Sequence, residues 1–196
     1  AGYCFQPSPL SREWEQKLAG FRKRTPRILL SFGSFLSHRA DLLEKYQRWI
    51  REILPESGIL VAAGDSEKSL GRLKDCQTLV ENFIPQTSLY PLMDLVIHHG
   101  GCNTFTECLY FGKPMIILPF ASDQFHIAAD GEEMGVAAVL NPQCVNREEL
   151  GQALRKMLSP EAQEASAHWR KVVRLRGPEY ACKEVMRLVK EENARN

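Results

Sequence analysis

One ten-residue stretch of the chain combines small, polar and acidic residues at a spacing that could hold a phosphorylated ligand. It reads His98-His99-Gly100-Gly101-Cys102-Asn103-Thr104-Phe105-Thr106-Glu107 and follows the apolar run Asp94-Leu95-Val96-Ile97, which predicts a strand. Paired glycines let the backbone come close to a ligand. The helix expected to begin near Thr104 would offer unpaired N–H groups and the positive end of its dipole. The stretch therefore favours a pyrophosphate site.

Each residue of this stretch also has a purely structural interpretation. Thr104 and Glu107 match the Ser/Thr-x-x-Glu capping box that begins many helices. Gly112 and Pro114 would end the same helix by ordinary rules. His99 alone could be a structural imidazole. Taken by itself, the stretch leaves phosphate binding and helix capping open.

Four motifs in register resemble the donor-binding signature of the UDP-glycosyltransferases, inverting enzymes with the two-domain GT-B fold. The family pattern is aromatic-x-Pro-Gln, a strand, His-x-Gly-x-Asn-Ser/Thr-x-x-Glu, Gly-x-Pro-Met and Pro-x-x-x-Asp-Gln. The matching segments are Phe83-Ile84-Pro85-Gln86, residues 99–107, Gly112-Lys113-Pro114-Met115 and Pro119-Phe120-Ala121-Ser122-Asp123-Gln124. The close match covers residues 82–142, and the Phe32-Gly33-Ser34 turn fits more loosely.

The resemblance implies a role for each motif in holding a UDP-sugar. Phe83 would stack on the uracil, the backbone of Ile84 would read the base edge, and Gln86 would help to fix the nucleoside. Glu107 would accept hydrogen bonds from the ribose hydroxyls. The alternatives are a core aromatic at a strand end for Phe83 and a polar helix start for Gln86.

The phosphates and the transferred sugar would lie on the later motifs. The residues implied at the phosphates are His99, Gly101, Cys102, Asn103 and Thr104, with Ser34 facing them across the cleft. At Cys102 we expect a backbone contact and no thiol chemistry. Asp123 and Gln124 would bind hydroxyls of the sugar, which the Asp-Gln pair suggests is glucose or glucuronic acid. Asp123 could also be the N-cap of the next helix, and the two roles can hold together.

The general base of this family, usually a His supported by an Asp, lies in an N-terminal half that the chain does not contain. His38, His98, His126 and His168 have no acidic partner at a distinctive spacing. We therefore expect no catalytic residue here, no metal and no cofactor apart from the UDP-sugar substrate. An acceptor-binding half would be supplied in the same protein or by a partner subunit, so the chain is expected to be a piece of a longer protein or a natural subunit.

Three other functions compete with this one. A lipid-linked N-acetylglucosaminyltransferase shares the donor half, sometimes on a separate chain. A non-catalytic nucleotide-sugar-binding module would have the same fold, although Glu107 and Asp123-Gln124 would then be unnecessary. A nicotinamide-dependent dehydrogenase is disfavoured, because Ser31-Phe32-Gly33-Ser34-Phe35 has one glycine where that class needs Gly-x-Gly-x-x-Gly.

The elements that must position these motifs alternate between short apolar runs and longer amphipathic ones. Strands are predicted at 27–33, 58–63, 78–83, 94–98, 115–118 and 136–140. Helices are predicted at 39–53, 104–111, 124–134, 147–158, 161–174 and 179–192, after a leading helix with Ser11 as N-cap. This alternation predicts an α/β fold, a doubly wound, Rossmann-like parallel sheet of about six strands, which the resemblance makes the C-terminal domain of a GT-B fold. Ligands of such sheets bind outside the carboxyl ends of the strands.

The expected organisation has three parts: a linker and leading helix (1–26), a nucleotide-sugar-binding domain (27–178) and a C-terminal helix (179–196). That helix would cross toward the N-terminal half. Its apolar residues Val185, Met186 and Val189 would be partly exposed in the isolated chain and could support a dimer.

Composition limits the other classes of partner. The 196 residues suit one domain, and a net charge of +1 does not indicate nucleic acid or an anionic membrane. No apolar run reaches the roughly 18–20 residues of a membrane span. The six cysteines are scattered without Cys-x-x-Cys pairs, which predicts buried free thiols in a reducing, cytoplasmic setting, with no disulfide scaffold or zinc site.

Overall fold

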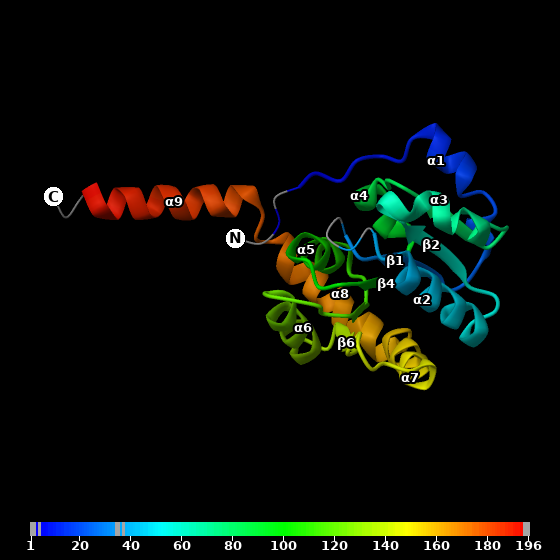
Figure 1. Ribbon diagram of the computed structural model, residues 1–196. Helices are drawn as coiled ribbons and strands as arrows, with labels where there is room; N and C mark the ends of the chain where they lie inside the picture. Colours follow the sequence, from blue (N-terminus) through cyan, green and yellow to red (C-terminus); the bar gives the residue numbers. More distant parts are fainter. Residues whose placement is uncertain (1–2, 4, 34–35, 37, 194–196) are drawn as a thin grey trace.

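The computed structural model describes residues 3, 5–33, 36 and 38–193 (Figure 1). Six parallel strands form one sheet in the order β3-β2-β1-β4-β5-β6. The strands are β1 (Arg27–Ser31), β2 (Gly58–Ala62), β3 (Thr78–Glu81), β4 (Leu95–His98), β5 (Met115–Ile117) and β6 (Ala137–Val139). The predicted doubly wound sheet is confirmed. The chain builds outward from β1 to β3, then returns to the centre with β4, so the strand order reverses between β1 and β4. Ligands of such folds bind at this switch point.

Helices cover both faces of the sheet, because alternate residues of each strand point to opposite sides. Against the core that contains Leu30, Val61 and Ile97 lie α2 (Ala40–Ile53), α3 (Glu67–Leu70) and α7 (Arg147–Met157). Against the core that contains Leu29, Leu60 and Val96 lie α1 (Arg12–Lys17), α4 (Gln86–Leu89), α5 (Cys102–Phe111), α6 (Gln124–Glu133) and α8 (Pro160–Arg174).

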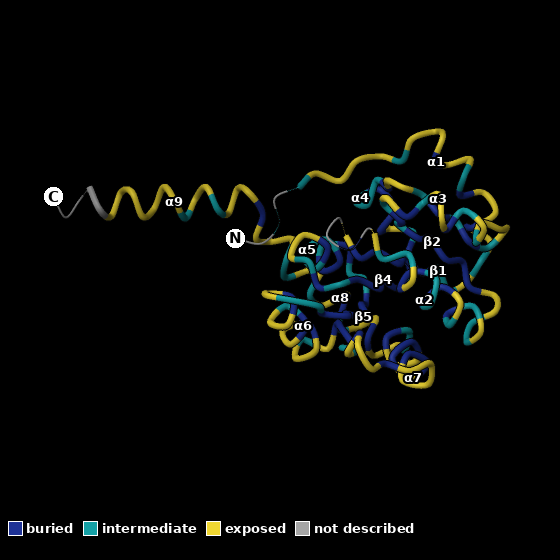
Figure 2. Tube along the Cα trace, viewed as in Figure 1, coloured by how far each residue is buried: buried dark blue, intermediate teal, exposed yellow. Residues whose placement is uncertain are grey.

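The leading segment packs onto the domain. The Ser11 hydroxyl accepts a hydrogen bond from the N–H of Trp14 at 3.4 Å, as predicted for an N-cap. Trp14, Leu18 and Phe21 are buried in the second core. At the other end of the chain, α9 (Pro178–Asn193) projects away from the domain and is exposed along most of its length (Figure 2). None of the described helices is both long and apolar enough to cross a membrane.

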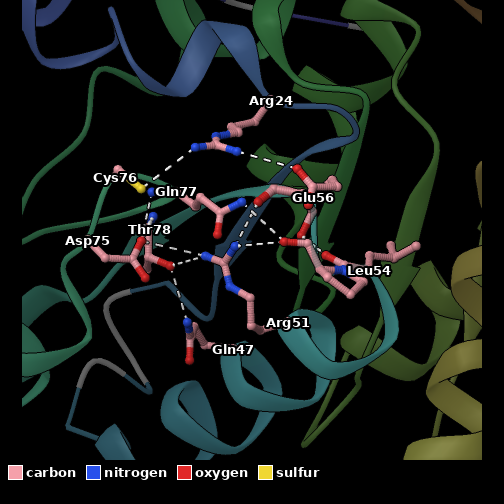
Figure 3. A network of polar contacts seen from close by, with 11 residues as sticks. Arg24, Gln47, Arg51, Leu54, Glu56, Asp75, Cys76, Gln77 and Thr78 are labelled. Carbon is pink, nitrogen blue, oxygen red and sulfur yellow. Dashed lines mark hydrogen bonds and ion pairs between the residues drawn. The ribbon is translucent and has the colours of Figure 1, made fainter.

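Polar contacts hold the amino ends of the strands, at the edge opposite the predicted site (Figure 3). The guanidinium of Arg51 in α2 donates to the Thr78 hydroxyl at 2.6 Å and to the carbonyl of Ser57 at 3.1 Å. Gln47 donates to the same Thr78 hydroxyl at 3.2 Å, and Asp75 accepts the N–H of Thr78 at 2.6 Å. These contacts hold α2 against the start of β3 and the residue before β2, so the strands that lead to the carboxyl edge are held in place at their amino ends.

Several expectations need correction. Helix α5 begins at Cys102 with Gly101 as its N-cap, two residues before the predicted start, so the capping-box interpretation of Thr104 and Glu107 is wrong. Two short helices, α3 and α4, and several single 3₁₀ turns were not predicted. The described cysteines are free, as expected, but Cys108 alone among them is buried, whereas Cys76, Cys102, Cys144 and Cys182 are exposed.

Candidate functional site

A cavity of about 480 Å³ opens at the carboxyl ends of β1, β2 and β3. Phe83, Ile84 and Gln86, which the sequence places at a nucleoside, share its lining. The ring of Phe83 is 84% exposed, so the alternative of a core aromatic is wrong. Ile84 is buried beneath it, and Gln86 is the first residue of α4. An exposed ring over a cavity that includes the polar residues Asp65 and Asn82 is a suitable platform for a heterocyclic base.

The imidazole of His99 is wedged between two glycines of different loops. A Cβ added to Gly33, after β1, would lie 2.7 Å from Cε1 of His99, and one added to Gly101 would lie 2.8 Å from Cε1 and Nε2. His99 thus joins the turn after β1 to the β4–α5 loop (residues 99–101). Burial lowers the pKa of His99, and the nearby carboxylate of Asp123 acts in the opposite direction.

The amino end of α5 has no side-chain cap. In contrast, Ser11, Asn146 and Ser159 cap α1, α7 and α8 with side-chain oxygens. The first N–H groups of a helix have no partner within the helix and carry the positive end of its dipole. Cys102 and Asn103 lie exposed in this first turn, and Thr104 is buried there. Like α2 and α6, α5 therefore begins without a side chain bound at its amino end.

Glu107 lies one turn further along α5, beside Tyr90. The atoms Glu107 Oε2 and Tyr90 Oη are both buried, and neither has a hydrogen-bond partner. Burial raises the pKa of Glu107, while the neighbouring Tyr90 hydroxyl lowers it by a smaller amount. The Tyr90 hydroxyl lies close enough to Glu107 to lower its pKa by hydrogen bonding, although the contact falls short of ordinary hydrogen-bond geometry. A carboxylate held in this way has spare capacity to accept hydrogen bonds from hydroxyl groups.

The β5–α6 loop (residues 118–123) is shaped by the side chain that follows it. The amide oxygen of Gln124 accepts the N–H groups of Phe120 at 2.7 Å and Ala121 at 3.1 Å. Ser122 has a φ of 54°, an uncommon conformation for a residue other than glycine. Asp123 is exposed at the N-cap position of α6, as the N-cap alternative predicts, although its side chain makes no capping bond. Gln124 itself is buried.

Several buried polar atoms without a partner belong to two neighbouring pairs, Tyr90 with Glu107 and His98 with His99. Of the seven such side-chain atoms among the described residues, four are Tyr90 Oη, His98 Nε2, His99 Nδ1 and Glu107 Oε2. Buried polar atoms nearly always have a partner, so a cluster without one calls for an explanation such as a bound polar ligand. The described residues contain no group of three or more His, Cys, Asp or Glu side chains that could hold a metal ion.

The residues predicted for the base follow β3, those predicted for the ribose and phosphates follow β4 or lie on α5, and those predicted for the sugar follow β5. Ser34 lies outside the described residues. Sequence reasoning missed His98 and Tyr90. His98 directly precedes the motif and was considered only as a possible base. Tyr90 lies in the 3₁₀ turn Tyr90–Leu92, which the residue pattern did not indicate.

Comparisons with known proteins give a consistent result. The family model of the glycosyltransferase family 28 C-terminal domain matches residues 40–175. UDP-glucuronosyltransferase 2B17 of Rattus norvegicus is 24% identical over 168 residues, which cover 85% of this chain and 31% of that protein. The uncharacterized UDP-glucosyltransferase YdhE of Bacillus subtilis (strain 168) is 27% identical over 133 residues, covering 67% of this chain and 33% of that protein.

A solved structure extends the likeness to the fold. The glycotransferase of kitacinnamycin has a TM-score of 0.78 at 23% identity, covering 95% of this chain and 47% of that chain. The chain therefore spans about a third of the length of the two relatives and about half of the solved structure.

Proposed function

The chain belongs to the family of the glycosyltransferase family 28 C-terminal domain, and on this basis we propose that it binds the UDP-sugar donor of an inverting glycosyltransferase. The observation that carries the proposal is that Glu107 Oε2 and His99 Nδ1, both buried and without a hydrogen-bond partner, belong to α5 and to the loop before its uncapped amino end. A nucleoside diphosphate supplies what these groups lack: ribose hydroxyls for a carboxylate and an anion for N–H groups.

The proposed donor lies along the carboxyl edge. The uracil stacks on Phe83, the ribose hydroxyls bind Glu107, and the diphosphate lies against the first turn of α5 beside His99. The hexose reaches Asp123, the exposed carboxylate of the β5–α6 loop. We propose glucose or glucuronic acid as this hexose, in keeping with the names of the relatives, a UDP-glucosyltransferase and a UDP-glucuronosyltransferase.

The chemistry proposed for this edge is stabilisation of the leaving group. An acceptor hydroxyl oxygen attacks the anomeric carbon as the bond from that carbon to the β-phosphate oxygen breaks, and UDP departs with the negative charge. N–H groups fixed at a helix end stabilise such charge without having to reorganise. The hydroxyl proton goes to a base that we place on an acceptor-binding half, in the same protein or in a partner subunit.

Titration of the chain with UDP tests the proposal directly. We expect UDP to bind, uridine to bind more weakly because it lacks the diphosphate, and ADP to bind more weakly because its base is larger. Isothermal calorimetry with UDP-glucose and UDP-glucuronic acid then ranks the sugars. Absence of UDP binding at millimolar concentration would refute donor binding.

Transfer by the chain alone is a separate test. We expect no glycoside when the chain is incubated with these donors and a panel of phenol, sterol and sugar acceptors, and glycoside formation once an acceptor-binding half is added. Mass spectrometry detects the product. Robust transfer by the chain alone would show that a base lies within it, with His126, two residues after Gln124, as the first to mutate.

A further inference from the structure

We propose that His98 is a positioning residue for the donor, because its ring sets the turn that packs the β4–α5 loop against the β5–α6 loop. The inference rests on the proposed function, since its purpose is to align the phosphate and sugar contacts. His98 touches the donor in none of the proposed contacts and acts through Gly100.

The first step is a hydrogen bond inside the turn. His98 is the last residue of β4 and is fully buried. Its Nδ1 accepts the N–H of Gly100, two residues later, at 3.1 Å. A side-chain acceptor that binds the N–H two residues ahead fixes a tight turn, as Asn and Asp side chains commonly do. Gly100 completes the turn with a φ of 92°, which favours glycine.

The ring keeps this bond because it stays neutral. Burial, and to a smaller extent the neighbouring His99, lowers the pKa of His98 to about 3. A neutral ring with an acceptor at Nδ1 carries its proton on Nε2, which is buried without a partner. Nδ1 of His98 can therefore accept the hydrogen bond from Gly100 at every pH at which a glycosyltransferase would be assayed.

The second step is contact between the two loops. A Cβ on Gly100 would lie 3.1 Å from the backbone oxygen of Gln124 and 3.2 Å from its Cβ, so the two residues are already in close contact. Gln124 in turn holds the N–H groups of Phe120 and Ala121. A continuous path therefore runs from His98 through Gly100 and Gln124 to the loop that presents Asp123. Displacing Gly100 therefore disturbs both the phosphate contacts and the sugar contacts of the proposed donor site.

Two substitutions distinguish the effect of the hydrogen-bond acceptor at Nδ1 of His98 from the effect of the bulk of its ring. Asn at position 98 can place its amide oxygen near the position of Nδ1 and is a residue that forms this kind of turn. Leu has similar bulk and no acceptor. His98→Leu exchanges one buried unpartnered donor, Nε2–H, for another, the N–H of Gly100. We therefore expect little change in Tm from it, but a loss of UDP affinity of about tenfold. His98→Asn should retain most of the affinity.

The control is Val96→Ala, on the same strand and the same face of the sheet, which should lower Tm and leave UDP affinity unchanged. Hydrogen exchange at the amides of Gly100, Phe120 and Ala121 reads the loop geometry without any ligand, and it should speed up in His98→Leu but not in His98→Asn. If the wild-type chain binds no UDP, the proposed function fails, and the exchange rates still decide the role of His98. Unchanged exchange and affinity in His98→Leu, or equal losses in both variants, would overturn the proposal.

Discussion

The absence of a side chain at Gly101 leaves the space that the imidazole of His99 occupies: a Cβ at Gly101 would lie 2.8 Å from Cε1 and Nε2 of that ring. The backbone of Gly101, with φ −65° and ψ 135°, is one that alanine adopts without strain. The glycine is therefore required by the neighbouring ring and not by its own conformation. Adding one methyl group tests the position of His99 with little other disturbance.

We expect Gly101→Ala to push His99 away from the amino end of α5 and to weaken UDP binding by about 1.5–3 kcal/mol, the scale of one lost hydrogen bond to a charged group. Tm should change little. Gly71→Ala is the matched control, because a Cβ there meets no atom within 4 Å. Calorimetry that gave equal UDP affinity for both variants would show that the position of His99 does not matter to the diphosphate.

Phe83 should contribute to binding and hardly at all to folding, because 84% of its surface is exposed. Phe83→Ala should leave Tm unchanged and weaken UDP by about 1–3 kcal/mol, the usual worth of base stacking. Phe83→Trp should bind UDP at least as well as the wild type. Titration with uridine measures the affinity for the nucleoside without the diphosphate. If Phe83→Ala weakens the binding of UDP but not of uridine, the base binds elsewhere.

Glu107→Gln should have opposite effects on stability and binding. Burial raises the pKa of Glu107 in the folded chain. The contribution of Glu107 to folding stability is therefore complete only below its ordinary pKa of 4.5, and it is lost as pH rises through the raised pKa. The variant should therefore melt at a higher temperature than the wild type at pH 7, and the two should converge below pH 4.5. Loss of the carboxylate should weaken UDP at pH 7 by about 1.5–3 kcal/mol.

The comparison for that experiment is Glu133→Gln, an exposed glutamate at the end of α6. Its melting temperature should follow that of the wild type at both pH values. A Glu107→Gln protein that melts below the wild type at pH 7 would mean that the carboxylate has a partner in the folded chain.

The outer surface of α9 should drive self-association of the isolated chain. Val185, Met186, Leu188 and Val189 are each about half exposed on this projecting helix. The double variant Val185→Lys, Val189→Lys should shift the chain toward monomer in analytical ultracentrifugation by at least about tenfold in Kd, since charges are costly in an apolar contact. UDP affinity should not change. Identical sedimentation of variant and wild type would leave α9 without this role.

Sequence patterns predicted the layers, the strand count and the kinship with UDP-glycosyltransferases, because short buried strands and a motif with fixed spacing are local signals. The kinship is confirmed by the family match. The predicted start of α5 at Thr104 was wrong. The turn at Gly100, with a φ of 92°, lets the helix begin earlier than the local capping pattern at Thr104 indicates.

Contacts between loops could not be read from the chain. The pattern places Gln124 beside a sugar, yet it does not reveal that the side chain turns inward to hold Phe120 and Ala121. It also gives no sign that Gly33 and Gly101, far apart in sequence, enclose the same imidazole. Such contacts depend on the packing of separate strands, which no window of neighbouring residues contains.

The strand order also limits the length of a ligand that can be held at both ends. Phe83 follows β3 and Asp123 follows β5, and the order β3-β2-β1-β4-β5 puts four strand spacings, about 19 Å, between their loops. A molecule that engages both must stretch across the reversal between β1 and β4. A sugar joined to its nucleoside through a single phosphate is too short for this reach and would leave either the ring or the carboxylate without its contact. In the proposed arrangement the distance across the sheet would therefore favour a donor with two phosphates, independently of any side chain that touches them.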